Sequence, residues 1–329
     1  MLLLNAAEVE QAAPMAALID AIEAGYREEA DGQVVLPPRL NMPNGRDGFF
    51  RIMPAVLNRS GLMGYKVFHG SMREGIRYLI ALYDQHSGIL LALMDAHYLT
   101  AARTGATTGV ATKFMARNDI ETIGVIGSGL EARTNLLGVA AVRKFRRIRV
   151  YSTNPQRRER FALNMAHELG IEATATDTPQ ACVKDVDLAI VATNSTGRAE
   201  QIAYRGAWMQ PGVHVNAIGS TMPRLREIDP DTFANANLIV GDSLGQMEEE
   251  SGDVIAAVAE NKYPRERLLE LKEIVAGRAK GRPNHTSVTL FKSVGTAIQD
   301  VLAGHVVYKE ALERGLGRQV DDILDPKFF

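Results

Sequence analysis

Apolar residues follow two different periodicities along this chain of 329 residues, and the change falls near residue 120. Before it, residues 14–30 repeat apolar positions at helical spacing, which predicts an amphipathic helix. Residues 34–99 are typical of strands and turns, with apolar runs at 78–83 and 89–94 on either side of a hairpin loop. Both runs are apolar at nearly every position, so we expect both faces of these strands to be covered.

The pattern after residue 120 alternates short apolar runs with helical segments, and it follows a predicted helix over 99–117 that is rich in Ala, Gly and Thr. Such small residues allow neighbouring backbones to approach closely. The alternation predicts a doubly wound parallel sheet with helices between its strands. The expected strands are 123–126, 148–152, 171–174, 188–193, 213–218 and 238–240, and the expected helices include 158–169 and 179–183.

A last long helix is predicted from Ser287 to Arg314, ending at Gly315. Its length indicates that it leaves the second domain and returns to pack on the N-terminal part. We therefore expect a discontinuous first domain, residues 1–117 with 303–329, and a second domain of residues 118–302.

The glycine-rich turn after the strand at 123–126 carries the most specific chemistry in the chain. Gly127 allows a tight turn, Gly129 lets backbone N–H groups approach a phosphate, and a helix opens at Leu130 and Glu131. Ala132 stands where a third glycine is common, a variant that the pattern permits. Between a strand and a helix, this turn predicts a dinucleotide-binding site at 118–302.

The end of the following strand indicates which dinucleotide is bound. NAD-binding proteins often carry an acidic residue there for the ribose 2′-hydroxyl, whereas this chain has Ser152, Thr153 and Asn154. Asn154 is a predicted helix N-cap and Pro155 the first helical residue. Arg157 then lies in the first turn, where the helix dipole disfavours a cation unless an anion binds beside it. We therefore predict NADP as the cofactor, with NAD possible.

Composition and charge exclude several other classes of protein. The net charge is −2 with acidic and basic residues interspersed, which gives no indication of a nucleic-acid or membrane partner. The longest apolar run, 89–94, is much shorter than a membrane span, and the N-terminus lacks the basic flank of a signal peptide. A single cysteine, Cys182, and scattered histidines predict a cytoplasmic protein with no metal site.

Short motifs are spread over nearly the whole chain: Leu36-Pro-Pro-Arg39, Arg51-Ile-Met-Pro-Ala55, Gly64-Tyr-Lys66, Leu99-Thr-Ala-Ala-Arg-Thr-Gly-Ala106, the glycine turn, Ala217-Ile-Gly-Ser220, Arg226-Glu-Ile-Asp229 and Phe291-Lys-Ser-Val-Gly295. In this combination and order they resemble the ornithine cyclodeaminase/µ-crystallin family. The resemblance implies an α/β fold, with a doubly wound parallel-sheet dinucleotide-binding domain plus a discontinuous α+β domain for substrate binding and dimerisation. It also implies an α-imino or α-amino acid substrate and a homodimer.

Residue by residue, the resemblance assigns Arg39 and Lys66 to the substrate carboxylate and Arg103 to the boundary between cofactor and substrate. A planar guanidinium offers bidentate contacts and a lysine adds a compact charge, which suits a carboxylate. By the same resemblance, Thr193, Ser220 and Ser293 contact the cofactor, and Val294 lies at the nicotinamide end beside the substrate.

Two departures from the cyclodeaminase pattern bear on the reaction. Thr221 stands where cyclodeaminases carry a proton-shuttling aspartate, and a hydroxyl does not act as a general base near neutral pH. Arg51 stands where that pattern has a glutamate suited to an amino side chain, so it repels a cationic ornithine. Thr221 relays a proton at most, and the proton source is Lys66 or water.

These features predict NADPH-dependent reduction of an α-imino acid, cyclic or acyclic, or the reverse dehydrogenation of an amino acid. One alternative is an ornithine cyclodeaminase-type lyase, which recycles NAD without net oxidation. The other is a crystallin-like binding protein that keeps the fold without turnover, although Arg39, Lys66 and Arg103 are all retained.

Overall fold

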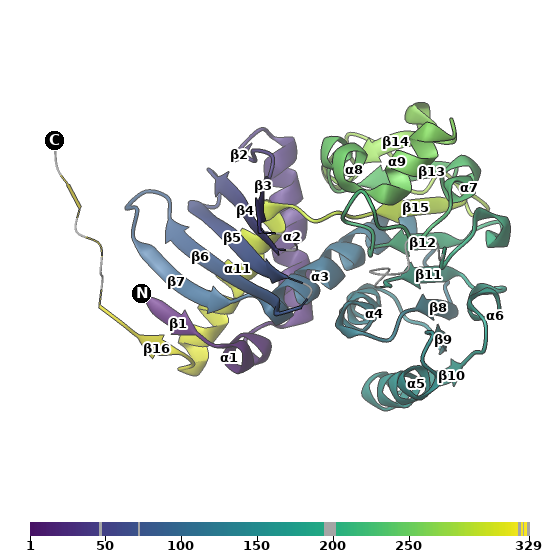
Figure 1. Ribbon diagram of the computed structural model, residues 1–329, viewed down its shortest axis with the longest axis horizontal. Coiled ribbons are helices and arrows are strands. Elements are labelled where there is room, and N and C mark those ends of the chain that lie inside the picture. Colours follow the sequence, from purple (N-terminus) through teal and green to yellow (C-terminus); the bar gives the residue numbers. More distant parts are fainter. Residues whose placement is uncertain (46–47, 72, 194–201, 322–323, 325, 328–329) are drawn as a thin grey trace. The chain divides into compact units, whose positions relative to one another are not determined.

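The computed structural model describes residues 1–45, 48–71, 73–193, 202–321, 324 and 326–327. Their contacts divide the chain into two compact units, Met1–Arg103 with Thr296–Phe329, and Thr104–Gly295 (Figure 1). The chain passes from one unit to the other after Arg103 and again after Gly295. Both positions precede the expected boundaries, which were after residues 117 and 302. The reason is that all of α11 (Ala297–Arg314) belongs to the first unit, whereas most of α3 (His97–Met115) belongs to the second.

The first unit is built on one mixed sheet with the strand order β16-β1-β7-β6-β5-β4-β2, and β3 also pairs with β4. The strands from β4 to β7 form an antiparallel meander, whereas β1 runs parallel to β7. The strands are β1 (Leu2–Leu4), β2 (Val34–Val35), β3 (Leu40–Asn44), β4 (Gly48–Leu57), β5 (Leu62–Ser71), β6 (Gly75–Asp84), β7 (Leu90–Asp95) and β16 (Arg318–Gln319).

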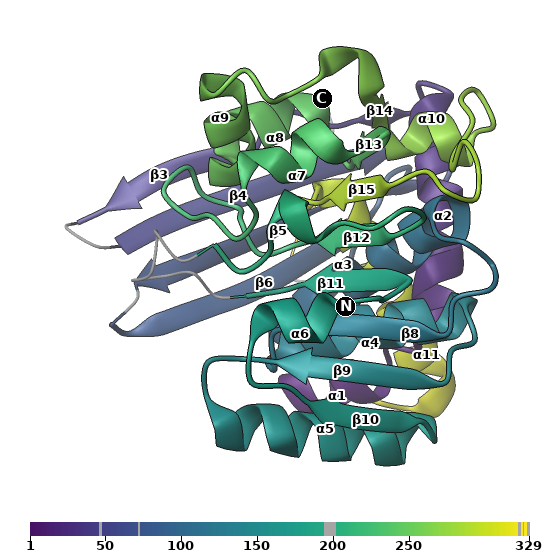
Figure 2. The ribbon, with the colours of Figure 1, turned by 90° about the vertical axis from the view of Figure 1, so that its right-hand side faces the viewer.

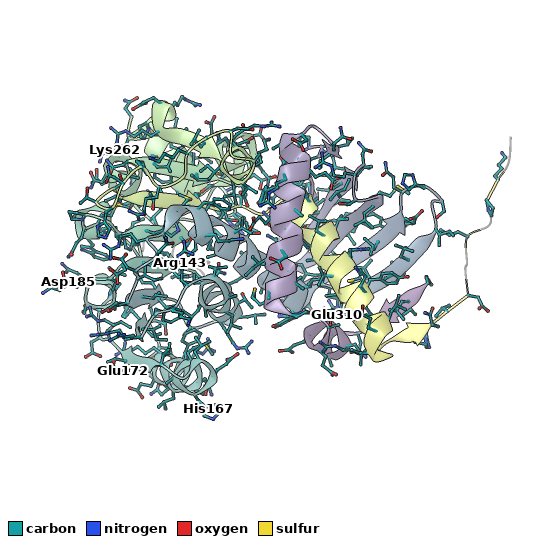
Figure 3. The ribbon with its side chains drawn as sticks, turned by 180° about the vertical axis from the view of Figure 1, so that it is seen from behind. Arg143, His167, Glu172, Asp185, Lys262 and Glu310 are labelled. Atoms are coloured by element: carbon teal, nitrogen blue, oxygen red, sulfur yellow. The ribbon has the colours of Figure 1, made fainter. Side chains whose placement is uncertain are left out.

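Two long helices, α2 (Met15–Ala30) and α11, lie side by side across one face of this sheet, and Figure 3 shows them in purple and yellow. A Cβ atom at Gly25 would lie 2.1 Å from Cδ1 of Leu302, so a larger residue there would require the Leu302 side chain to move. Glu310, labelled in Figure 3, accepts a hydrogen bond from Arg314 one turn later on α11. The short helix α1 (Ala6–Gln11) precedes α2 and begins with a capping box at Asn5.

The helix predicted over 14–30 and the hairpin around 84–88 are confirmed. The expectation that both faces of the hairpin strands are covered is wrong for the described chain itself. Leu79 is 37% exposed, and Met63, Tyr65, Val67 and Leu93 are only partly buried on the face opposite α2 and α11. The apolar pattern therefore reflects a surface that the unit's own helices leave uncovered.

The second unit is a doubly wound parallel sheet with the strand order β10-β9-β8-β11-β12-β15-β13-β14 (Figure 2), as predicted. Its strands are β8 (Thr122–Ile126), β9 (Arg147–Tyr151), β10 (Glu172–Ala175), β11 (Leu188–Val191), β12 (His214–Ala217), β13 (Leu238–Gly241), β14 (Leu268–Glu270) and β15 (Thr289–Lys292). The helices are α4 (Leu130–Val142), α5 (Pro155–Leu169), α6 (Pro179–Val183), η1 (Gly206–Trp208), α7 (Pro230–Asn235), α8 (Leu244–Glu250), α9 (Gly252–Ala259), η2 (Arg265–Arg267) and α10 (Leu271–Val275).

The helix predicted from Ser287 to Arg314 is wrong in its first part. Thr289–Lys292 forms β15, a fully buried strand between β12 and β13. Its β-branched and aromatic residues favour a strand, and Gly295 adopts a φ of 79°, a left-handed conformation that interrupts a helix. The helix therefore starts only at Ala297.

The small residues of the helix predicted over 99–117 do permit close packing, as expected. A Cβ atom at Gly138 of α4 would lie 1.9 Å from the carbonyl oxygen of Gly105 in α3. Arg143, labelled in Figure 3, follows α4 and donates hydrogen bonds to the carbonyls of Lys113 and Arg117. Among the residues that the structure describes, no helix has the length and apolarity to cross a lipid bilayer.

Candidate active site

The glycine turn between β8 and α4 has the geometry of a phosphate-binding loop. Gly127 has a φ of 130°, and a Cβ atom there would lie 2.3 Å from the carbonyl oxygen of Ala192. Gly129 is the N-cap of α4, and a Cβ atom there would meet no described atom within 4 Å. Ala132 is fully buried, so the third position of the motif packs rather than binds. The backbone N–H groups that open α4 thus border open space, as an anion requires.

The sheet changes winding direction at this turn, because β8 lies between β9 on one side and β11 on the other. In such sheets ligands bind in the crevice at the carboxyl ends of the strands beside this switch point. The turn is fixed to the neighbouring strand end: Gly127 N donates to Tyr151 O at 2.8 Å, and the hydroxyls of Ser128 and Ser152 are 2.9 Å apart.

The end of β9 confirms the predicted helix cap. Asn154 Oδ1 accepts a hydrogen bond from Arg157 N at 2.9 Å, and Pro155 begins α5. The Arg157 side chain is exposed, whereas Arg158, which the sequence analysis did not select, lies against the strand end. Arg158 donates to Ser152 O at 3.3 Å and forms an ion pair with Asp177. Arg158 therefore lies against the polar strand end at Ser152, whereas Arg157 contacts Asn154 through its backbone N–H.

The loops after β11, β12 and β15 hold the other predicted cofactor residues. Thr193 donates to Glu227 through both its backbone N–H and its hydroxyl, each at 3.0 Å. Ser220 is buried and donates to Leu225 O, while Thr221 beside it is half-buried. Glu227 links the loops after β11 and β12. It belongs to the motif Arg226-Glu-Ile-Asp229, but the motif alone gave it no role among the predicted site residues.

Ser293 and Val294 lie in the loop after β15, not in the helix where they were predicted. Ser293 Oγ donates to Asp242 Oδ2 at 2.7 Å, and the backbone N–H groups of Val294 and Gly295 donate to the same carboxylate at 3.0 and 2.7 Å. Asp242, at the end of β13, is thus a second missed residue that shapes this edge of the sheet.

The first unit brings two of the predicted substrate residues, Lys66 and Arg103, to one buried carboxylate. Lys66 Nζ on β5 and Arg103 Nε on α3 lie 2.9 and 2.8 Å from the same oxygen of Asp300, in the first turns of α11. Arg103 Nη1 also donates to Gln299 Oε1 at 2.7 Å, and Gln299 donates to the hydroxyl of Tyr26. Lys66 and Asp300 are almost fully buried. Asp300 was missed because the prediction treated it as part of an ordinary helix.

The charges around Lys66 favour the binding of an anion. Burial lowers the pKa of Lys66 from 10.5 to about 7; Asp300 opposes this shift, and the positive charges of Arg103 and Arg39 add to it. Three basic groups thus act together around one acidic group. Arg51 lies on the same sheet face, with its guanidinium 5.6 Å from the centre of the Phe68 ring.

The structure therefore sorts the predicted site residues into two groups. Arg39, Arg51, Lys66 and Arg103 belong to the first unit, and the remaining predicted residues, from Gly127 to Val294, belong to the second. No group of three or more His, Cys, Asp or Glu side chains suited to a metal ion occurs within the described ranges.

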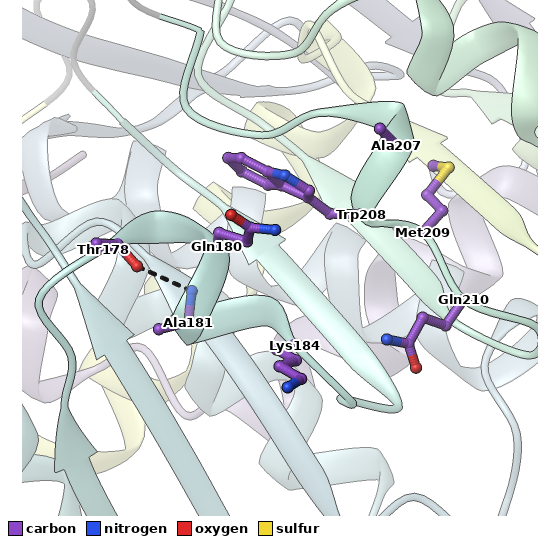
Figure 4. A pocket seen from close by; sticks show the side chains of 8 residues that line it. All are labelled: Thr178, Gln180, Ala181, Lys184, Ala207, Trp208, Met209 and Gln210. Carbon is purple, nitrogen blue, oxygen red and sulfur yellow. Dashed lines mark hydrogen bonds between the residues drawn. The ribbon is translucent and has the colours of Figure 1, made fainter.

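A surface hollow of about 410 Å³ lies elsewhere on the second unit, between α6 and η1 (Figure 4). Trp208, Gln180 and Lys184 line it. Lys184 precedes β11 and Gln210 precedes β12, so the hollow lies towards the amino ends of these strands, away from the glycine turn.

Comparisons with known proteins agree with this geometry. The family model for the ornithine cyclodeaminase/mu-crystallin family matches residues 1–315. The chain is 36% identical to the Delta(1)-pyrroline-2-carboxylate reductase of Thermococcus litoralis, whose structure with NADH and L-proline matches with a TM-score of 0.91 over 97% of this chain and 100% of that one.

Two further relatives span nearly the whole chain. The Delta(1)-pyrroline-2-carboxylate reductase of Bacillus cereus is 30% identical, over 98% of this chain and 100% of its own length. An archaeal alanine dehydrogenase dimer with bound NAD is 29% identical, with a TM-score of 0.88 over 98% of this chain and 99% of that one. The chain belongs to the ornithine cyclodeaminase/mu-crystallin family.

Proposed function

We propose that this protein uses a reduced nicotinamide cofactor to reduce the C=N bond of an α-imino acid, or catalyses the reverse dehydrogenation of an amino acid. The observation that carries the proposal is the buried cluster of Lys66, Arg103 and Asp300, with Arg39 acting on it. It provides a cationic site for a carboxylate on one unit, while the other unit provides a dinucleotide fold.

The residues of the second unit fit a dinucleotide. Gly127 and Gly129 leave room for the pyrophosphate at the start of α4, and no acidic residue stands at Ser152 to Asn154. When bound, the nicotinamide supplies a hydride. The two named relatives of known structure contain NADH or NAD. The preference for NADPH is therefore proposed for this chain from its own strand end at Ser152 and from Arg157.

The residues of the first unit fit the other reactant. Arg39 and Arg103 offer planar guanidinium groups to a carboxylate, and Lys66 adds a compact charge. Within the described chain the Lys66 ammonium donates to Asp300, which leaves N–H groups for a ligand. A pKa of about 7 also suits a group that gives a proton to the imine nitrogen and takes it back near neutral pH.

Thr221 favours reduction over cyclodeamination. Thr221 is a half-buried residue in the loop after β12, where a cyclodeaminase would need a general base. A threonine holds or relays a proton there and does not remove one. One relative is an archaeal alanine dehydrogenase, named for an acyclic amino acid. The test below therefore includes both cyclic and acyclic substrates.

Assembly as a homodimer is proposed from the uncovered face of the first unit's sheet. Met63, Tyr65, Val67, Leu79 and Leu93 form a partly exposed apolar surface that faces away from α2 and α11. A contiguous apolar surface of this kind marks a protein interface. The archaeal alanine dehydrogenase relative is itself a dimer.

The function is tested by steady-state oxidation of NADPH and NADH with a panel of cyclic imino acids and of 2-oxo acids plus amines. We expect pyrroline- or piperideine-2-carboxylate to consume the cofactor, with NADPH preferred. Arg39→Ala should lower kcat/KM by about 30-fold or more, because losing the partner of a desolvated carboxylate costs about 2–5 kcal/mol. Arg59→Ala, an exposed arginine paired with Asp31, serves as the control. The proposal would be refuted if no substrate of the panel caused oxidation of NADPH or NADH.

A further inference from the structure

Glu227 forms the centre of a buried hydrogen-bond network in the second unit. Its Oε2 atom accepts hydrogen bonds from Thr193 N and Thr193 Oγ1, both at 3.0 Å, and its Oε1 atom accepts one from Gly219 N. Both oxygens thus face backbone N–H groups, which donate and cannot accept. This arrangement favours the ionised carboxylate, because the two backbone N–H groups can only donate and, of the three named partners, only the Thr193 hydroxyl could accept a proton from Glu227.

The backbone of Gly219 closes tightly over this carboxylate. A Cβ atom at Gly219 would lie 2.3 Å from Glu227 Oε2 and 2.4 Å from the carbonyl oxygen of Thr193. Only glycine fits such an approach. Glu227 therefore joins the loop after β11 to the loop after β12, and Gly219 allows the two loops to approach closely enough for this contact.

Two more buried charges hold Glu227 itself. Asp253, in the first turn of α9, accepts a hydrogen bond from Glu227 N at 2.8 Å, and Lys292 Nζ lies 3.3 Å from Asp253 Oδ2. Glu227, Asp253 and Lys292 are all fully buried. Burial raises the pKa of Glu227, Lys292 opposes the shift, and Asp253 adds to it. Apolar residues would avoid these penalties, so the retained network indicates a role beyond packing.

The network lies where one half of a dinucleotide would bind. Thr193, Gly219 and Lys292 stand at the carboxyl ends of β11, β12 and β15. The residues that select the adenosine ribose follow β9, on the other side of the switch at β8. A dinucleotide with its pyrophosphate at α4 therefore places its nicotinamide half over the strand ends that Glu227 joins.

We propose that Glu227 is a positioning residue for the nicotinamide half of the cofactor: it fixes the backbone of Thr193 and Gly219, and so the floor of that half-site. This inference rests on the proposed function. Glu227 itself touches no reactant and acts through the two loops. The adenosine half-site at Ser152 and Asn154 does not depend on it.

The test is Glu227→Gln, in which the amide nitrogen would oppose the backbone N–H donors. Calorimetric titration compares NADPH with 2′-phospho-ADP-ribose, which lacks the nicotinamide. We expect the affinity for NADPH to fall about tenfold, the usual scale for losing a buried charged acceptor, and the affinity for 2′-phospho-ADP-ribose to stay within about twofold. Asp253→Asn weakens the hydrogen bond that holds Glu227 N. It should lower the affinity for NADPH by less than Glu227→Gln does, again without changing the affinity for 2′-phospho-ADP-ribose. This variant provides the test if Glu227→Gln does not fold.

Glu28 of the first unit provides a matched control. It is also buried and accepts two backbone N–H groups, from Arg59 and Ser60, and the hydroxyl of Ser60. Glu28→Gln should lower the melting temperature and leave both affinities unchanged. Equal losses of both ligands in Glu227→Gln, or no loss of either, would overturn the inference alone. Failure of the unaltered protein to bind either NADPH or NADH would overturn the proposed function together with the inference.

Discussion

Lys66 illustrates how a buried cation acquires a chemical role. Taking an ammonium out of water favours its neutral form, and one carboxylate, Asp300, only partly restores the charge because Arg103 and Arg39 oppose it. The bound carboxylate of a substrate adds the negative charge that the cluster lacks. The free protein and the substrate complex therefore differ in the proton affinity of Lys66.

This difference predicts a pH profile. Because the pKa of Lys66 in the free protein is lowered to about 7, the ammonium is present below that pH and is lost above it. The kcat/KM for a cyclic imino acid should therefore fall as the pH rises through about 7, since kcat/KM reports the free enzyme. The groups facing Lys66 are Asp300 from α11, Arg103 from α3, Arg39 and the Phe68 ring.

Lys66→Arg is the control for this profile, because a guanidinium keeps its charge over the same range. Its kcat/KM should be lower but lose the decline near pH 7. The same decline in both proteins would assign it to titration of the substrate or of another residue.

The sequence indicated Lys66, Arg39 and Arg103 but none of the acids that hold the predicted site residues. Asp300 and Asp242 lie far along the chain from the groups they bind and belong to none of the listed motifs. Glu227 lies in the motif Arg226-Glu-Ile-Asp229, but the motif does not indicate that its carboxylate binds Thr193. Contacts of this kind depend on tertiary structure. The pattern of the chain therefore predicts which residues meet a ligand better than which residues position them.

Packing between elements depends on single glycines in this fold. Glycine in a helix is disfavoured by about 0.5–1 kcal/mol relative to alanine, so Gly138 in the middle of α4 requires a reason. The carbonyl of Gly105, 1.9 Å from where a Cβ atom would lie, provides it. The close approach of α3 and α4 outweighs the helix propensity.

Gly138→Ala should therefore destabilise the protein by about 1–3 kcal/mol, the scale of overpacking, despite the gain in helix propensity. Gly245→Ala is the matched control: Gly245 is in α8, and a Cβ atom there would meet nothing within 4 Å. This control should be neutral or slightly stabilising. Thermal unfolding measures both, and a Gly138→Ala protein as stable as the control would disprove the close contact.

Local patterns predicted most elements but not β15. The segment Thr289–Lys292 has only two apolar residues, and a strand of four residues is too short for periodicity to decide. Its central place between β12 and β13 is a property of the whole sheet. For this reason the predicted helix began at Ser287, although α11 begins only at Ala297.

At the scale of the whole molecule, the uncovered sheet face predicts a dimer. A charge at its centre would have to be desolvated on association, so Leu79→Glu should convert a dimer into monomers at micromolar concentration. Leu163→Glu, at a 72% exposed position of α5, should leave the mass unchanged. Light scattering that gave a monomer for the unaltered protein would contradict the assembly.

The apolar pattern of β6 and β7 already indicated two covered faces, yet only the structure shows that α2 and α11 cover one of them. The fold class followed from the alternation after residue 120, whereas the unit boundaries did not. The helix α3 begins in the first unit and ends in the second, and nothing in its sequence indicates that the boundary falls after Arg103.

The central claim is that hydride passes from the nicotinamide to the α-carbon of an imino acid. The most direct measurement uses NADPH deuterated at the transferable position of C4, with pyrroline-2-carboxylate as substrate and mass and NMR analysis of the product. The account predicts one deuterium per molecule of proline, located on Cα, and one NADPH oxidised for each. Proline without deuterium would contradict it, as would release of ammonia from ornithine with no net change in the cofactor.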